Sequence, residues 1–189
     1  MSRDARSEGL RDTLLALDPL DELERGDVAA TLELLEGTEA PFDEHAQPHH
    51  VTASAFAVSD LGVVLHRHRR LGIWLQPGGH VDEGEAPADA ALRELVEETG
   101  VVAVHLEPAV LVHVSVHDTP WGHRHYDCRW LVEATRTELE PAAGESAEVR
   151  WLEPDAAIAI CAPDLVVGLG TALDTARRLG LAAVASWPP

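Results

Sequence analysis

One segment, residues 79–101, constrains this chain more than any other, because it combines glycines, regularly spaced carboxylates and a helical pattern. Gly79 is followed after five residues by Glu85, and after seven more by the run Arg-Glu-Leu-Val-Glu-Glu-Thr-Gly-Val at 93–101. Pro87 suits the first position of a helix, where its missing N–H has no intrahelical partner. Gly100 tolerates the left-handed backbone that often ends a helix. We therefore predict a helix from about Pro87 to Thr99.

The two faces of this predicted helix differ in chemistry. At about 100° per residue, one side carries the core candidates and the other a carboxylate cluster; they are Ala88, Leu92, Leu95, Val96 and Thr99 on the first side, and Glu94, Glu97 and Glu98 on the second. Carboxylates this close repel each other, which raises the pKa of at least one of them unless a cation neutralises the group. A solvated acidic face is the ordinary interpretation of a Glu-rich helix, but the flanking glycines and the spacing favour a Mg²⁺ or Mn²⁺ site. Zinc usually brings His or Cys ligands, which this face lacks.

Two further charged residues and two glycines of the segment are predicted to support that site. Glu85 precedes the helix and Arg93 lies within it, so we expect a buried ion pair that ties the loop to the helix. Gly78 and Gly79 allow a sharp backbone bend, which would let the Gly79 carbonyl join the metal ligands.

The spacing of residues 79–101 resembles that of the Nudix hydrolases, the MutT-like family, over roughly residues 50–180. The resemblance implies an α/β/α sandwich with a mixed sheet, in line with strand patterns on both sides of a central helix. It also implies that Glu94, Glu97 and Glu98 bind Mg²⁺ or Mn²⁺, with the Gly79 carbonyl as a further ligand. The implied reaction is metal-dependent hydrolysis of a diphosphate bond in a nucleoside diphosphate linked to another group, as in a nucleoside triphosphate or nucleotide sugar, with water attacking phosphorus.

Which carboxylate acts as general base stays open at this point. Glu98 is one candidate, and Glu145, in the loop before the last predicted strand, is another; Glu148 is a third, and Glu94 belongs to the same catalytic group. For Glu145 alone, a solvated loop acid is the plainer interpretation. A non-catalytic Nudix-fold sensor that binds a nucleotide is the alternative function, and the retained carboxylates favour catalysis over it.

Candidate substrate residues gather around a predicted hairpin whose turn is Trp121-Gly122. They are His113, His123 and His125, with His117 nearby, Trp121 and Tyr126 as aromatic rings, His80 from the motif loop, and Arg67 as a candidate for a terminal phosphate. The histidines fit a phosphate and base pocket, an accessory metal site at His123 and His125, or ordinary surface positions. The stretch Trp74–His80 resembles a bacterial subgroup that shares the His-x-His-Tyr-Asp stretch at 123–127, and this resemblance fixes no substrate.

The rest of the chain predicts its organisation and setting. We expect an N-terminal helical extension (1–45), a Nudix domain (46–183) and a tail (184–189). The extension is predicted to hold one helix at about 7–17 and a second helix that Asp18 caps, with Pro19 at its first position. We consider three roles for the extension: it covers apolar surface, it forms a lid over the substrate, or it takes part in a dimer interface. The net charge of -19 argues against binding to a nucleic-acid duplex. The sequence shows no apolar signal segment and no membrane span, and its two cysteines suggest no disulfide framework, so we expect a cytoplasmic protein. The expected partner is a small-molecule diphosphate substrate, and a homodimer is one option.

Overall fold

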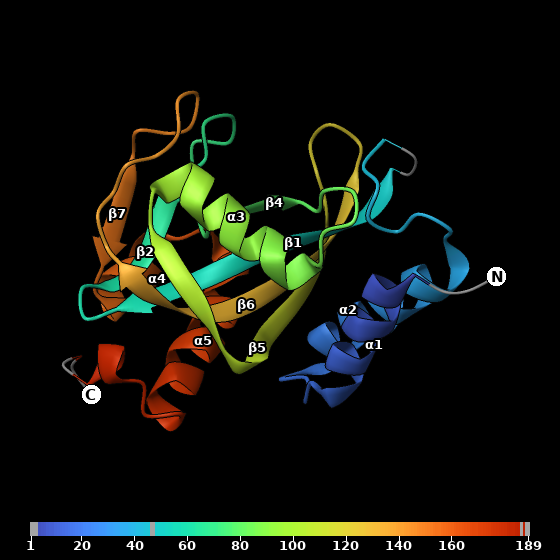
Figure 1. Cartoon of the computed structure of the whole chain (residues 1–189), viewed down its shortest axis with the longest axis horizontal. Coiled ribbons are helices and arrows are strands. Elements are labelled where there is room, and N and C mark those ends of the chain that lie inside the picture. Colours follow the sequence, from blue (N-terminus) through green and yellow to red (C-terminus); the bar gives the residue numbers. More distant parts are fainter. Residues whose placement is uncertain (1–3, 46–47, 186, 188–189) are drawn as a thin grey trace.

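The computed structural model describes residues 4–45, 48–185 and 187, and it shows one mixed sheet between two layers of helices. Figure 1 shows α3 crossing one face of the sheet, while α5 lies against the other face. The predicted α/β/α sandwich is therefore confirmed.

The longest run of the sheet has the order β3-β2-β1-β6-β5, with β4 paired to β1 and β7 paired to β2. The strands are β1 (His49–Ser59), β2 (Gly62–Arg67), β3 (Trp74–Leu75), β4 (Gly78–His80), β5 (Val102–Asp118), β6 (Arg124–Arg136) and β7 (Val149–Leu152). The central pair β1 and β6 is parallel and the other pairs are antiparallel. Strand β5 is one long strand, although its pairing with β6 shifts register between His105 and Val110.

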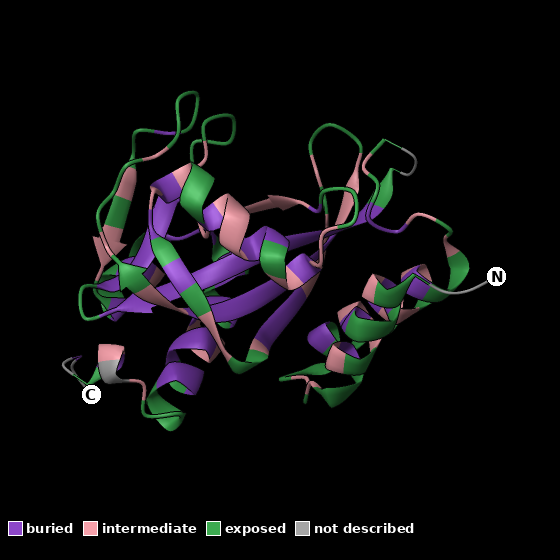
Figure 2. Cartoon of the chain, in the orientation of Figure 1, coloured by how far each residue is buried: buried purple, intermediate pink, exposed green. Residues whose placement is uncertain are grey.

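The two faces of the sheet carry two separate cores, because side chains alternate along the central strand. Val51 and Ala53 of β1 belong to the core beneath α3 (Pro87–Thr99), whereas Phe56 and Val58 belong to the core beneath α4 (Pro154–Ile160) and α5 (Val166–Arg178). Figure 2 shows that β1 and β6 are buried along most of their length. Short 3₁₀ helices at Pro163–Leu165 and Ala182–Val184 flank α5.

Helix α3 has the predicted bounds, and Gly100 ends it with φ of 79°. A side chain at Gly100 would also overlap the backbone of Glu140. Both the positive φ and this close contact therefore require glycine at the position. The predicted core face was partly wrong: Leu95 and Thr99 are buried, but Val96 is 43% exposed and the buried stripe is completed by Ala90 and Ala91. The helix is rotated because two of its glutamates also face the sheet.

The N-terminal extension forms two helices, α1 (Ala5–Ala16) and α2 (Glu22–Gly37), which lie beside the edge of the sheet at β5. The predicted cap at Asp18 was wrong, since Asp21 caps α2 by accepting a hydrogen bond from the Glu24 amide. The buried Glu24 carboxylate accepts the Val114 amide at 3.1 Å, and Asp27 accepts the Val116 amide at 3.1 Å. Carboxylates of α2 thus satisfy amides on the outer edge of β5, which no other strand covers within the described residues.

The C-terminal residues assigned to a tail partly belong to the fold. Val184 and Trp187 are buried in the core beneath α5, and the Trp187 indole donates to the Ser59 carbonyl at 3.0 Å. Residues 186, 188 and 189 of that tail, and residues 1–3 of the extension, lie outside the described residues. Cys128 and Cys161 are buried and unpaired, as predicted. Across the described residues, no helix combines the length and the apolar character that crossing a membrane requires.

Candidate active site

The glycines before α3 are needed for close packing, not for the sharp bend that we predicted. Gly78 and Gly79 lie in the extended strand β4, paired with β1, and neither has a positive φ. A Cβ atom on Gly79 would lie 2.5 Å from Oε1 of Glu94, and one on Gly78 would overlap Ser54. The missing side chains therefore let α3 bring a carboxylate against the backbone of β4.

The three motif glutamates of α3 differ in burial. The side chains of Glu94 and Glu98 are 16% and 12% exposed, whereas that of Glu97 is 50% exposed. Burial raises the pKa of Glu98 to about 8, and the carboxylates of Glu94 and Glu145 add to the rise. A hydrogen bond from the Gly78 amide to Glu98, 2.9 Å long, opposes that shift without cancelling it. Burial also raises the pKa of Glu94, against the pull of Arg93.

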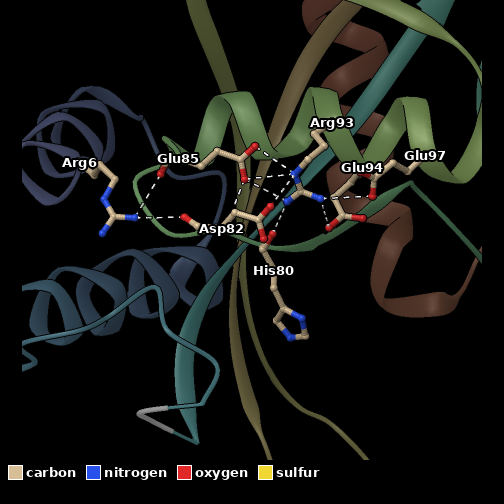
Figure 3. A network of polar contacts seen from close by, with 7 residues as sticks. All are labelled: Arg6, His80, Asp82, Glu85, Arg93, Glu94 and Glu97. Atoms are coloured by element: carbon tan, nitrogen blue, oxygen red, sulfur yellow. Dashed lines mark hydrogen bonds and ion pairs between the residues drawn. The ribbon is translucent and has the colours of Figure 1, made fainter.

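Arg93 of α3 joins this helix to β4 and to the loop that carries Glu85 (Figure 3). Its guanidinium contacts Glu85 at 3.0 Å, Glu94 at 2.9 Å and Glu97 at 3.4 Å, and it donates to the His80 carbonyl at 2.8 Å. The expected pair of Glu85 and Arg93 is thus present and mostly buried. Burial disfavours the charged form of Glu85, but hydrogen bonds from Arg93 and the Asp82 amide outweigh it and lower the pKa.

The N-terminal extension reaches the same loop through Arg6 of α1. Its Nη1 donates to the carbonyls of Asp82 and Glu85 at 3.3 and 3.4 Å (Figure 3). The extension therefore contacts the loop that carries Glu85, on the side away from the carboxylates of α3.

A cavity of about 1000 Å³ opens beside Glu98, between the motif strand, the hairpin and the loop before β7. Glu98, Gly79 and Glu145 contribute to its lining, so the structure brings both candidate bases to one space. Within the described residues the Glu145 side chain makes no hydrogen bond or ion pair, which leaves its carboxylate available. Glu148, the third candidate, instead pairs with Arg67 at 2.9 Å.

Buried polar residues that the sequence prediction missed also line this cavity. Asp127 and Arg129 of β6 form an ion pair 2.8 Å long, and Asp127 also accepts hydrogen bonds from Ser54 and Gln76. The second residue missed is His66 of β2, whose Nε2 lies 3.6 Å from Oε2 of Glu98. Burial lowers the pKa of His66 to about 4, so this ring is neutral at pH 7.

The hairpin histidines meet at the other part of the cavity. His80, His123 and His125 line it, together with His117 and Trp121, whose indole ring lies 5.6 Å from the Arg70 guanidinium carbon. Burial, and then the neighbouring His50, His117 and His80 rings, lower the pKa of His125 to about 3. Two residues near this group were absent from the sequence prediction: His50, at the start of β1, and Glu44, in the segment before β1.

Three predicted substrate residues do not line the cavity. Arg67 is exposed and bound to Glu148 and to the Gly72 carbonyl. His113 is buried against Gly168 of α5, on the same face of the sheet as His117 but outside the cavity. Tyr126 is buried in the core beneath α3. For Arg67 and Tyr126 this placement follows from strand alternation, since each is the neighbour of a cavity residue along its strand and points to the other face. His113 is kept out of the cavity because α5 packs over it.

A hard divalent cation fits the carboxylate end of the cavity. Of the two buried glutamates only Glu94 contacts Arg93. Among the described residues Glu98 has no cationic partner, because the nearby His66 ring is neutral. Burial and then the neighbouring carboxylates raise the pKa of Glu98, and a bound cation would offset both effects. The donors here are carboxylate oxygens, which Mg²⁺ and Mn²⁺ accept as ligands.

Comparisons with known proteins agree with this geometry. Among curated relatives, an RNA pyrophosphohydrolase from Erythrobacter litoralis is 34% identical over 103 residues, covering 46% of this chain and 63% of that protein. A probable DHNTP pyrophosphohydrolase from Lactococcus lactis is 34% identical over 99 residues, covering 49% and 58%. The chain thus spans less than two thirds of the length of either relative.

A solved structure and a family profile also show similarity to Nudix proteins. A NUDIX-family hydrolase from Clostridium perfringens superposes with a TM-score of 0.57 at 26% identity, over 67% of this chain and 97% of that one. The profile described as NUDIX domain matches residues 48–167, which include the glycine strand, the motif helix and the cavity. The chain therefore belongs to the Nudix family.

Proposed function

We propose that this chain is a metal-dependent hydrolase that cleaves a diphosphate bond in a nucleoside diphosphate linked to another group. The observation that carries the proposal is the pair of buried glutamates, Glu94 and Glu98, held against glycine strand β4 at a cavity large enough for a nucleotide. The names of the two curated relatives, both pyrophosphohydrolases, support the same reaction class.

The roles of the residues follow from their positions. Glu94, Glu97 and Glu98 would hold Mg²⁺ or Mn²⁺, with the Gly79 carbonyl as a further ligand. A bound divalent cation supplies positive charge to a diphosphate and acidifies water for attack on phosphorus. Arg93 fixes the rotamer of Glu94, and Glu85 fixes Arg93, so that the carboxylates need little rearrangement when a cation binds.

Glu145 and Glu98 are the two candidates for the general base. Glu145 faces Glu98 across the cavity and its carboxylate is unbonded within the described residues, which suits proton removal from a water molecule. Glu98 accepts the Gly78 amide and lies within the metal ligand group, which suits coordination. We therefore assign the base to Glu145 and metal binding to Glu98.

Substrate recognition is assigned to the part of the cavity away from α3. Arg69 and Arg70 lie at its rim, where they can pair with phosphate oxygens, and Trp121 offers an exposed ring face for a nucleobase. A nucleoside triphosphate and a nucleotide sugar both match this arrangement. The subgroup resemblance of Trp74–His80 stays a prediction and does not choose between them.

The setting of the protein is proposed on composition. The net charge of -19 supports a small-molecule substrate over a nucleic-acid duplex. We propose a cytoplasmic location and leave the homodimer as a proposal, which light scattering of the purified chain would test.

The decisive experiment is a turnover assay with Mg²⁺ on nucleoside triphosphates, dinucleoside polyphosphates, ADP-ribose, nucleotide sugars and a short RNA with a 5′-triphosphate. Reaction in ¹⁸O-water identifies the phosphorus that is attacked, because the label enters one product only. Glu98→Gln is expected to weaken Mg²⁺ binding and lower kcat, whereas Glu145→Gln is expected to lower kcat by about 10²–10⁴-fold with Mg²⁺ affinity unchanged.

Two outcomes would contradict the proposal. Absence of turnover across the panel, combined with tight binding of one nucleotide, would instead support the non-catalytic sensor. Turnover that persists in both glutamine variants would show that the reaction does not use the α3 carboxylates. Equal loss in both variants, with equal loss of Mg²⁺ affinity, would overturn the assignment of Glu145 as base.

A further inference from the structure

Strand pairing places histidines from three strands in one row. His50 of β1 is the register partner of His125 of β6, and His125 is the register partner of His117 of β5. His123 lies two residues before His125 and therefore shares its face of the sheet. His80 of β4 pairs beside this row, opposite Thr52. The fold thus gathers five imidazoles, three from the hairpin of β5 and β6 and one each from β1 and β4.

The rings are close enough to share one ion. Ring centroids lie 5.0 Å apart for His50 and His125, and 5.3 Å apart for His50 and His123. One nitrogen from each of these three rings lies within 4.8 Å of the other two. With Zn–N bonds of about 2.0–2.1 Å, small side-chain rotations bring three such nitrogens onto one centre.

Neighbouring groups have the chemistry of an outer ligand shell. Oε2 of Glu44 lies 3.1 Å from Nδ1 of His80, a carboxylate–histidine contact of the kind that orients metal-binding imidazoles. Nε2 of His125 and Nε2 of His80 are buried and have no hydrogen-bond partner among the described residues. A buried imidazole nitrogen without a hydrogen-bond partner is costly, and a bound ion would satisfy that of His125.

We propose that His50, His123 and His125 form a binding site for a transition-metal ion of the zinc type, separate from the carboxylate site on α3. Three imidazole ligands select Zn²⁺ and similar ions over Mg²⁺, which prefers oxygen. The rings of His80 and His117 lie 5.4 and 5.7 Å from that of His125, and His123 and His125 line the cavity. The proposal goes beyond the hydrolase function, because it adds a second ion with different ligand chemistry to the same cavity.

The test is direct metal binding to the full-length chain without an affinity tag. The protein is stripped with a chelator, loaded with Zn²⁺ in competition with a chromophoric chelator, and analysed for bound metal by mass spectrometry. We expect one Zn²⁺ per chain, retained in excess Mg²⁺, and a visible Co²⁺ spectrum typical of a low-coordinate nitrogen site. His123→Gln and His125→Gln should each weaken Zn²⁺ binding by at least about tenfold.

Two control variants separate this site from other effects. His105→Gln removes a histidine of β5 that instead contacts the Ala88 carbonyl, and it should bind Zn²⁺ like the parent chain. Glu98→Gln should also retain Zn²⁺, so loss of hydrolysis and loss of zinc are independent readouts. His123 lies at the hairpin, which makes its variant the safer one if His125→Gln fails to fold by circular dichroism.

The proposal is overturned if the stripped chain binds no Zn²⁺ at micromolar protein, or if His123→Gln and His105→Gln bind it equally well. It is also overturned if Glu98→Gln, and not the histidine variants, abolishes zinc binding.

Discussion

Replacing Arg93 with Met tests whether the buried ion-pair network supports the fold. The side chain of Arg93 is 26% exposed, and its partners Glu85 and Glu94 are 17% and 16% exposed. Removing one partner of a fully buried pair costs about 3–5 kcal/mol, while exposed pairs are worth about 0–1 kcal/mol. Between these limits we expect a loss of about 2 kcal/mol, which is a fall in Tm of about 4–8 °C for a chain of this size.

Arg67→Met is the matched control for that experiment. Arg67 and Glu148 are also joined by a contact of 2.9 Å, but both side chains are about half exposed. The control should therefore lose less than about 1 kcal/mol in urea unfolding. If both variants lose equal stability, burial is not what gives the Arg93 network its strength. A double-mutant cycle of Arg93→Met with Glu85→Gln then measures the coupling between the two residues.

Three other predictions address the site, the edge strand and pH. Gly79→Ala should weaken Mg²⁺ binding in calorimetry, because the added methyl group displaces the Glu94 carboxylate. Glu24→Gln should lower the free energy of unfolding by about 1–3 kcal/mol, since an amide cannot accept from both the Leu20 and the Val114 amides as the carboxylate does. Burial lowers the pKa of His113 to about 4, whereas the same side chain in the unfolded chain has a pKa of about 6.5. As the pH drops, the unfolded chain therefore binds a proton at this residue before the folded chain does. The free energy of unfolding should fall between about pH 6.5 and about pH 4, by about 3 kcal/mol from this residue.

Each of these has a control in the same chain. Gly26→Ala, at an open position on α2, should leave Mg²⁺ binding unchanged, so an equal effect of both glycine variants would refute the steric explanation. Glu22→Gln, in the same turn as Glu24 but 91% exposed, should be near neutral. The pH dependence should become shallower in His113→Gln; an unchanged slope would mean that other groups cause it.

The sequence predicted those parts of the structure that depend on local pattern. The bounds of α3 followed from Pro87 and Gly100, and the pairing of Glu85 with Arg93 followed from the motif. Its core face was predicted less well, because a helical wheel cannot show that Glu94 and Glu98 turn toward the sheet. Their burial depends on the absence of side chains in β4, which is a tertiary contact.

The histidine cluster could be predicted only in part, because some of its residues are brought together by tertiary contacts. His123 and His125 were recognisable as neighbours on one strand face, but His50 joins them only through the parallel pairing of β1 with β6. Glu44 joins through a loop contact with His80. His113 was misplaced for a different reason: it shares the strand face of His117, but α5 packs over it at Gly168, a tertiary contact that the sequence pattern does not show.

The two carboxylates of α2 that bind β5 have a consequence for the chain as a whole. An uncovered strand edge is a template on which another chain can add its own strand. Because Glu24 and Asp27 accept the amides of Val114 and Val116, these two amides are not available to a strand from another chain. A chain shortened to begin after α2 would keep its carboxylate site and its cavity. It would nevertheless expose the amides of β5 to strands of other chains, so we expect such a chain to aggregate more readily than the parent.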